Sequence, residues 1–173
     1  IIYSSDNGYF MGEHGYWDKR IDYESSMKIS MLIRYPEKIK PGTRIEEQAL
    51  NIDLAPTILD LAGVETPNYM QGESMVKLLD GENNDENWRD AFMFEYYVDD
   101  AYPYAGPNML AIKSDRYKLV DAFLEDDIDE LYDLKNDPGE MNNLIDDPKF
   151  EAIEKRLRRE LDALKEKYKY NPD

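Results

Sequence analysis

The chain contains 173 residues, of which 42% are hydrophobic, and it carries a formal net charge of −17. This length accommodates one sizeable domain or two small lobes, and the apolar content excludes a chain that is disordered throughout. The acidity argues against a nucleic-acid partner, whose phosphates need Lys and Arg, and no apolar run approaches the roughly 18 residues of a membrane-spanning helix.

The charge is distributed unevenly along the chain. Residues 1–40 carry six basic and six acidic side chains, so the whole excess of negative charge belongs to residues 41–173. Because salt screens exposed charges beyond about 8 Å, the neutral first segment can set its own local potential, and the acidic remainder does not exclude a small anionic substrate. There is no cysteine, so the chain forms no disulfide and its redox compartment is undetermined.

Two short β-strands are predicted in the first forty residues. Residues 1–5 are rich in β-formers and end in a turn signal, and residues 28–36 have an apolar centre closed by Pro36. Neither segment shows the alternation of a one-sided strand, so we expect both to be central strands of a covered parallel sheet. The chain begins at Ile1, inside the first strand, so we expect it to be part of a longer protein.

A helix is predicted over residues 51–63. Asp53 is the expected N-cap, Pro56 fits the first turn and Gly63 closes the C-terminal end. The expected buried stripe of this helix consists of Leu54, Ile58 and Leu61. Two strands followed by a helix indicate an α/β layer.

The second half is predicted to be a small antiparallel sheet packed by a helix. After a polar boundary at residues 81–90, three or four short β-rich segments follow, with a hairpin turn at Ser114-Asp115. We therefore divide the chain into residues 1–88, which complete the edge of an α/β domain, and residues 89–173, a subdomain of sheet plus helix. In the final amphipathic helix the apolar residues recur every three or four positions, at Phe150, Ile153, Leu157, Leu161, Leu164 and Tyr168.

The sequence SSDNG, residues 4–8, allows two interpretations. Asn-Gly is a strong hairpin-turn signal, but the glycines at positions 12 and 15 would break the second strand that a hairpin needs. Alternatively, Asp6 and Asn7 stand at the C-terminal end of a strand, where ligand sites of open α/β sheets lie. A carboxylate and an amide oxygen suit Ca²⁺ or Mg²⁺ rather than zinc, although two ligands do not complete a site.

Two other side chains could take part in chemistry. Lys19 follows Asn7 by twelve residues, and His14, the sole histidine, lies between glycines that permit a tight path into a cleft. The structural alternatives are a solvated lysine and a loop histidine bonded to backbone or water.

Several short motifs follow one another along the chain. It reads SDNG, MGEHG, WDK and YESS, then IDLAPTILDLAG over residues 52–63, and ELYDL, DP and EMNNL over residues 130–144. This series resembles the C-terminal block of type I sulfatases of the alkaline-phosphatase superfamily. Members of that family commonly read S-D-[HN]-G, L-G-E-H-G, W-x-K, Y-E-x-S, I-D-L-A-P-T-L-L-D-L-A-G and E-L-Y-D-L. Where the family often has R-V-P, this chain has Lys28-Ile29-Ser30.

The resemblance implies a fold and a set of site residues. The expected fold is α/β, the C-terminal part of an alkaline-phosphatase-like sulfatase domain followed by the small antiparallel sheet and its C-terminal helix. Asp6 and Asn7 would be ligands of an active-site Ca²⁺, with Mg²⁺ as the other candidate, and Lys19 would contact the sulfate group. His14 matches only some branches of the family and would have a catalytic or substrate-binding role.

The resemblance also implies what lies outside the chain. The family's nucleophile is a formylglycine made from the Cys or Ser of C/S-x-P-S-R, and it belongs with two further metal ligands to an N-terminal part. The chain alone is therefore expected to be inactive.

The expected function is hydrolysis of sulfate esters, of small molecules or of sulfated glycans such as those that bacteria degrade. The alternatives are a phosphatase or phosphonate monoester hydrolase of the same superfamily and a non-catalytic binding lobe. Expected protein partners are the N-terminal part of the same protein or a second copy of the chain. The family implies a periplasmic or secreted location.

Overall fold

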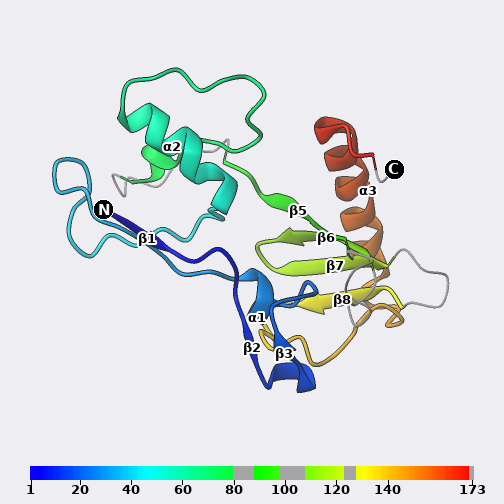
Figure 1. The fold of residues 1–173 in the computed structure, drawn as a ribbon. Helices are drawn as coiled ribbons and strands as arrows, with labels where there is room; N and C mark the ends of the chain where they lie inside the picture. Colours follow the sequence, from blue (N-terminus) through cyan, green and yellow to red (C-terminus); the bar gives the residue numbers. More distant parts are fainter. Residues whose placement is uncertain (80–87, 98–107, 123–127, 172–173) are drawn as a thin grey trace. The chain divides into compact units, whose positions relative to one another are not determined.

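The computed structural model describes residues 1–79, 88–97, 108–122 and 128–171 (Figure 1). The chain forms two compact units, and each unit contains two segments of the sequence. The first unit comprises Ile1–Asp6 and Ser30–Asp90, and the second comprises Asn7–Ile29 and Ala91–Asp173. The predicted boundary at residues 81–90 lies mostly outside the described residues, and the division at residue 88 stays a prediction about the complete sulfatase domain. No helix in the described ranges is long and apolar enough to cross a membrane.

The two predicted strands of the first unit are present, but they are not parallel. Strand β1 (Ile2–Ser4) pairs antiparallel with β4 (Met31–Ile33), with Tyr3 opposite Leu32. Tyr3 and Leu32 are each 66% exposed, whereas the flanking residues of both strands are half-buried. The expectation of two covered parallel strands is therefore wrong here, because three-residue strands are too short for the sequence to reveal their alternation.

The predicted helix is confirmed, but its buried side differs from the expected one. A 3-10 turn, η2 (Asn51–Asp53), leads into α2 (Leu54–Leu61). Gly63, with a φ of 70°, follows the helix, and Val64 N–H donates to the Leu59 carbonyl, which is the bond that a glycine-closed helix end makes. Asp53 occupies the predicted N-cap position of α2, but its carboxylate makes no capping bond to this helix.

The buried side of α2 is formed by Pro56 and Thr57. Ile58, expected in the apolar stripe, is 53% exposed, and its two stripe partners are half-buried. The apolar cluster of the first unit lies instead around the 3-10 helix η3 (Met75–Leu78). It contains Met75, Leu78 and Trp88, with Met31, Ile33, Ile45 and Leu54 packed against it.

The second unit is built on the predicted antiparallel sheet. Its strands are β5 (Ala91–Tyr96), β6 (Met109–Ser114), β7 (Tyr117–Ala122) and β8 (Glu130–Asp133), hydrogen-bonded in that order. The turn between β6 and β7 falls at residues 115–116, next to the predicted position.

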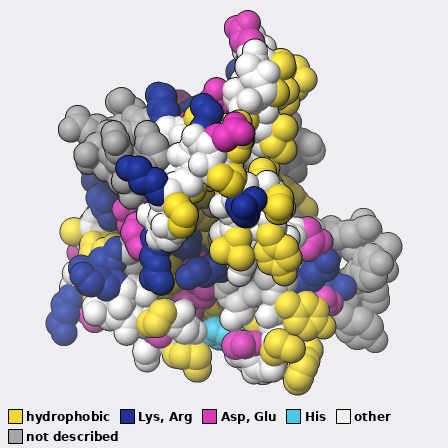
Figure 2. Space-filling view, turned by 90° about the vertical axis from the view of Figure 1, so that its left-hand side faces the viewer, with side chains coloured by type: hydrophobic (Ala, Val, Ile, Leu, Met, Phe, Trp, Pro, Cys, Tyr) yellow, Lys and Arg dark blue, Asp and Glu magenta, His cyan; other side chains and the backbone are white. Residues whose placement is uncertain are grey.

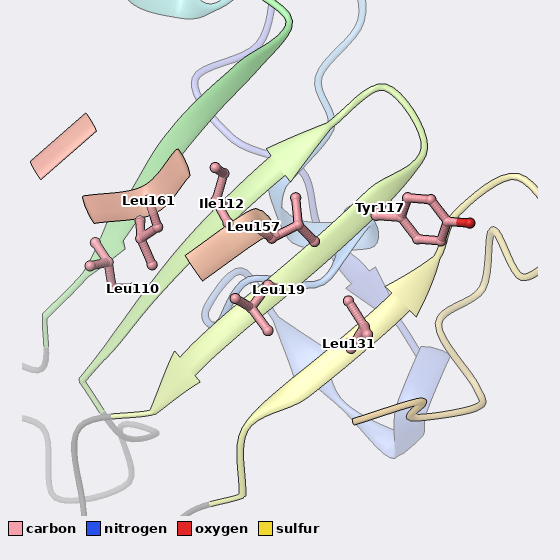
Figure 3. Close-up of a cluster of buried hydrophobic side chains, with 7 residues drawn as sticks. All are labelled: Leu110, Ile112, Tyr117, Leu119, Leu131, Leu157 and Leu161. Carbon is pink, nitrogen blue, oxygen red and sulfur yellow. The ribbon is translucent and has the colours of Figure 1, made fainter. Parts of the chain in front are cut away.

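One face of this sheet is covered by α3 (Glu151–Tyr168), as the apolar repeat predicts. Leu157 and Leu161 of α3 point into the sheet and are almost completely buried (Figure 3). The strand residues that meet them are Leu110, Ile112, Tyr117, Leu119 and Leu131. The predicted fold class, an α/β sulfatase segment with a small antiparallel sheet and a C-terminal helix, is confirmed by the similarities to solved structures given below.

The opposite face of the sheet is covered by residues 7–29, which the sequence analysis had assigned to the first domain. This segment contains β2 (Phe10–Met11), the 3-10 turn η1 (Glu13–Gly15), β3 (Trp17–Asp18) and α1 (Glu24–Met27). The apolar part of its contact with the sheet consists of Phe10, Ile21, Met109, Ala111 and Val120. The segment that contains Asn7, His14 and Lys19 thus packs against the four-stranded sheet.

Candidate active site

SSDNG does not form a hairpin. Strand β1 pairs with β4 and β2 pairs with β3, so residues 5–9 connect two strands that do not pair with each other. Asp6 and Asn7 therefore follow a strand end, as the ligand interpretation requires. Asp6 is exposed, and Ser5 Oγ lies 3.5 Å from its Oδ1.

The Asn7 side chain is held in one orientation by α1. Its Nδ2 donates to the Ser26 carbonyl at 2.9 Å and lies 3.3 Å from Ser26 Oγ. Since the nitrogen and oxygen of an amide lie on opposite sides, this contact turns Oδ1 away from Ser26.

Gly8 makes this arrangement sterically possible. Its N–H donates to the Ser26 carbonyl at 2.8 Å, and a Cβ at this position would lie 2.3 Å from the Ser25 carbonyl oxygen. The glycine of SSDNG is therefore required for close approach of the backbone of α1, rather than for the sharp turn expected from the sequence.

The donor set of Asp6 and Asn7 fits a hard divalent cation. A carboxylate and an amide oxygen on consecutive residues are ligands that Ca²⁺ accepts. Within the described part of the chain, no group of three or more His, Cys, Asp or Glu could hold a metal ion. The role of Asp6 and Asn7 as metal ligands stays a prediction.

His14 lies at the tip of the β2–β3 hairpin, where Gly12 N–H donates to the Tyr16 carbonyl at 3.0 Å. His14 itself adopts a left-handed conformation with a φ of 52°, between Gly12 at 120° and Gly15 at 76°. Its imidazole stacks on the Tyr23 ring, with 4.0 Å between centroids and 12° between planes. Figure 2 shows the only histidine, in cyan, partly exposed at the surface.

Lys19 follows β3 directly and is exposed. Its backbone N–H donates to Asp18 Oδ1 at 2.8 Å, and the Arg20 guanidinium lies 3.2 Å from Asp18 Oδ2. Asp18 and Ile21 have positive φ angles, 116° and 60°, which side-chain-bearing residues rarely adopt. Strained backbone of this kind persists where surrounding contacts enforce it, and it often occurs at functional sites.

Tyr23 is a residue of this region that the sequence analysis missed. Besides stacking on His14, its hydroxyl lies 3.3 Å from Glu130 Oε1, and burial of the ring raises the pKa of the phenol to about 12. The signal was present, because Tyr23 is the tyrosine of the Y-E-x-S motif, but the motif gave it no role.

The similarities to known proteins decide which family this is. A family model described as N-sulphoglucosamine sulphohydrolase, C-terminal, matches residues 12–167. The chain belongs to this family and is the C-terminal portion of a sulfatase of the alkaline-phosphatase superfamily. The family predicted from the sequence motifs is thereby confirmed.

Individual relatives agree with this placement of the sulfatase portion. An N-acetylglucosamine-6-O-sulfatase from Bacteroides thetaiotaomicron is 38% identical over 177 residues, a match that covers 100% of this chain and 31% of the relative. A solved structure described as a complex with its substrate D-glucosamine-2-N,6-O-disulfate is 37% identical and superimposes with a TM-score of 0.93. That match covers 99% of this chain and 35% of the other.

A third similarity concerns an enzyme that is not named as a sulfatase. The phosphonate monoester hydrolase of Agrobacterium radiobacter superimposes with a TM-score of 0.83 at 27% identity, covering 97% of this chain and 36% of that one. The sulfatase portion thus spans about a third of the length of the relatives it matches.

Proposed function

We propose that the protein carrying this sulfatase portion hydrolyses a sulfate ester of a sulfated aminosugar. The observation that carries the proposal is the similarity over 99% of the chain to a structure holding a disulfated glucosamine as its substrate. The relative named N-acetylglucosamine-6-O-sulfatase supports the same substrate class.

In this proposal the chain supplies groups that surround the sulfate, while the formylglycine nucleophile belongs to the preceding part of the protein. Asp6 and Asn7 hold a Ca²⁺, which when bound stabilises negative charge on the sulfate oxygens. Asn7 is suited to this role because Ser26 fixes its amide nitrogen and leaves the oxygen on the other side.

Lys19 and His14 act on the substrate side. The Lys19 ammonium neutralises charge that develops on the sulfuryl group, and its backbone is held by Asp18 directly after β3. The His14 imidazole is kept in place by the Tyr23 ring and contacts the sugar or the leaving oxygen.

The test compares sulfate release by the complete, formylglycine-bearing protein with that of three variants. Lys19→Ala is expected to lower kcat/KM for N-acetylglucosamine-6-sulfate by about 10²–10³-fold, the usual effect of removing one group that stabilises transition-state charge. Asp6→Ala and Asn7→Ala are expected to weaken Ca²⁺ binding measured by titration calorimetry.

Lys28→Ala is the matched control, since Lys28 is an exposed lysine of the same segment. It should leave kcat/KM unchanged. Equal activities of Lys19→Ala and Lys28→Ala would refute the role of Lys19.

A second candidate is hydrolysis of a phosphonate or phosphate monoester, which the similarity to the phosphonate monoester hydrolase favours. Parallel assays of p-nitrophenyl sulfate and p-nitrophenyl phenylphosphonate distinguish the two. Faster turnover of the phosphonate would support this second function against the sulfatase proposal.

A further inference from the structure

Beneath the segment that carries the candidate site residues lies a buried ion pair. Lys118, on the central strand β7, has a fully buried side chain, and its ammonium contacts Glu140 Oε1. Glu140 has a left-handed backbone with a φ of 54° and is buried as well. Burying two charges costs desolvation energy that an apolar pair would not, so such a pair is weak evidence for stability alone.

Each partner of this pair also binds the backbone of the active-site segment. Lys118 Nζ donates to the Asp22 carbonyl, and Glu140 Oε2 accepts from the Glu24 N–H at 2.7 Å. A second lysine of the sheet, Lys113, binds Glu24 Oε2 at 2.7 Å. Lys118, Lys113 and Glu140 therefore hold the chain on both sides of Tyr23, at Asp22 and at Glu24.

Tyr23 connects these contacts to the candidate site residues. Its ring carries the stacked His14, and the Lys118 ammonium lies 5.5 Å from the centroid of the same ring. The Tyr23 carbonyl accepts from Ser26 N–H at 2.8 Å, which begins α1, and the Ser26 carbonyl in turn accepts from the Asn7 amide. A displacement at Tyr23 would thus move both His14 and Asn7.

We propose that Lys118 and Glu140 are positioning residues of the active site, which act through the Asp22–Glu24 backbone to hold His14 and Asn7. This inference rests on the proposed function for its kinetic consequence, whereas the anchoring itself can be measured without any substrate. Both side chains are buried and are bonded to the backbone of residues 22 and 24.

The first experiment replaces Lys118 by Met in the complete protein and measures both anchoring and activity. Amide hydrogen exchange of peptides covering residues 20–27 should become at least about tenfold faster, because the bond from Lys118 to the Asp22 carbonyl is lost and Glu140, which accepts from the Glu24 N–H, loses its cation. The kcat/KM for sulfate release should fall roughly 10–100-fold, the range found when a group that orients an active-site ligand is removed.

The matched control is Arg116→Met, in the turn that directly precedes the same strand. Arg116 also makes an ion pair with a carboxylate of the sheet, that of Asp133. Within the part of the chain that the structure describes, this ion pair makes no side-chain hydrogen bond to residues 7–29. Exchange in residues 20–27 and kcat/KM should remain those of the wild type. If both variants accelerate exchange equally, Lys118 has no special anchoring role and the proposal is overturned.

A double variant, Lys118→Met with Glu140→Met, separates positioning from stability. Replacing a buried ion pair by apolar side chains of similar volume often keeps or restores stability, so this variant covers the case in which the single one fails to fold. A melting temperature near that of the wild type combined with reduced kcat/KM and fast exchange supports positioning. Activity that recovers together with stability overturns it.

Failure of the proposed function would be recognised separately. If the wild-type protein releases no sulfate but the exchange results hold, the anchoring stands and the reaction assigned to the site is wrong. If sulfate release is normal in every variant although exchange is fast, the positioning role is wrong and the proposed function stands.

Discussion

The two units of this chain bury their apolar residues in different ways. In the second unit the four-stranded sheet has an apolar cluster on each face. One cluster lies beneath α3 and the other beneath residues 7–29. In the first unit one small cluster surrounds η3, and exposed large apolar side chains occur in both units, for example Leu32 in the first and Trp17 in the second. The second unit has the core of an independent domain, whereas the first does not.

Polar contacts carry more of the organisation in the first unit. The Asp53 carboxylate is fully buried and accepts from the N–H groups of Leu50 at 2.7 Å and Glu73 at 2.9 Å. The Arg89 guanidinium binds both of its oxygens and the Gln48 carbonyl. One residue thus joins three segments of the first unit.

The largest predicted effect breaks this buried ion pair. Arg89→Met should lower the free energy of unfolding of the first unit by about 3–5 kcal/mol, because it leaves the buried Asp53 carboxylate without its cation. The chain has two tryptophans, one in each unit. In a Trp17→Phe background, urea unfolding followed by fluorescence of the buried Trp88 reports on the first unit alone.

Arg44→Met is the control for this experiment, since Arg44 is an exposed arginine of the same unit. Its effect should stay within about 0.5 kcal/mol, as for most surface substitutions. An equally small loss for Arg89→Met would show that the first unit does not depend on the Asp53 ion pair.

A matched pair of leucines tests the contrast between the units directly. Leu119→Ala, at a fully buried position beneath α3, should cost about 2–5 kcal/mol. Leu32→Ala, at a position that is 66% exposed, should cost no more than about 0.5 kcal/mol in this chain. Urea unfolding followed by circular dichroism measures both.

The same substitution in the complete protein sharpens the comparison. If Leu32→Ala costs far more there than in this chain, the exposed face of the first unit is covered by another part of that protein. If it costs as much in the chain alone, this face is already covered in solution, by self-association or by other contacts, and the contrast between the units is smaller than the structure indicates.

The sequence predicted the elements whose pattern is local and missed the contacts that depend on distant partners. The final helix and its buried leucines follow from an apolar repeat of three or four residues. Gly63 marks the end of α2 because the chain takes a positive φ of 70° there, which glycine adopts without strain. The buried ion pair of Asp53 with Arg89 was missed, because the local sequence of a helix N-cap gives no sign of a partner 36 residues later.

The site was predicted to a similar extent. The motifs nominate Asp6, Asn7, His14 and Lys19, whose roles stay predictions, and the exclusion of a hairpin required the strand pairing. The anchoring of residues 7–29 by Lys118 could not be predicted, since a lysine in an apolar strand gives no sign of which backbone it will bind a hundred residues earlier in the chain.

A smaller effect than that of Arg89→Met is predicted for the ion pair between Arg116 and Asp133 at the edge of the second unit. Arg116 holds Asp133 through two hydrogen bonds, and this partner lowers the pKa of the Asp133 carboxyl from 3.8 to about 2. A carboxyl whose pKa is lower in the folded state stabilises the fold above its unfolded pKa and loses that contribution as the pH falls through its folded pKa. The stability difference between wild type and Asp133→Asn should therefore be constant above about pH 5 and shrink between about pH 4 and 2.

The size of this difference in stability distinguishes the Arg116–Asp133 pair from the buried Arg89–Asp53 pair of the first unit. Because the Arg116 side chain is 46% exposed, the contribution at neutral pH should be no more than about 1 kcal/mol. Urea midpoints at a series of pH values measure it, and in an Arg116→Met background the pH dependence should largely disappear. A loss at pH 7 as large as that of Arg89→Met would mean that the second unit, despite its two-sided apolar core, depends on an ion pair as much as the first unit does.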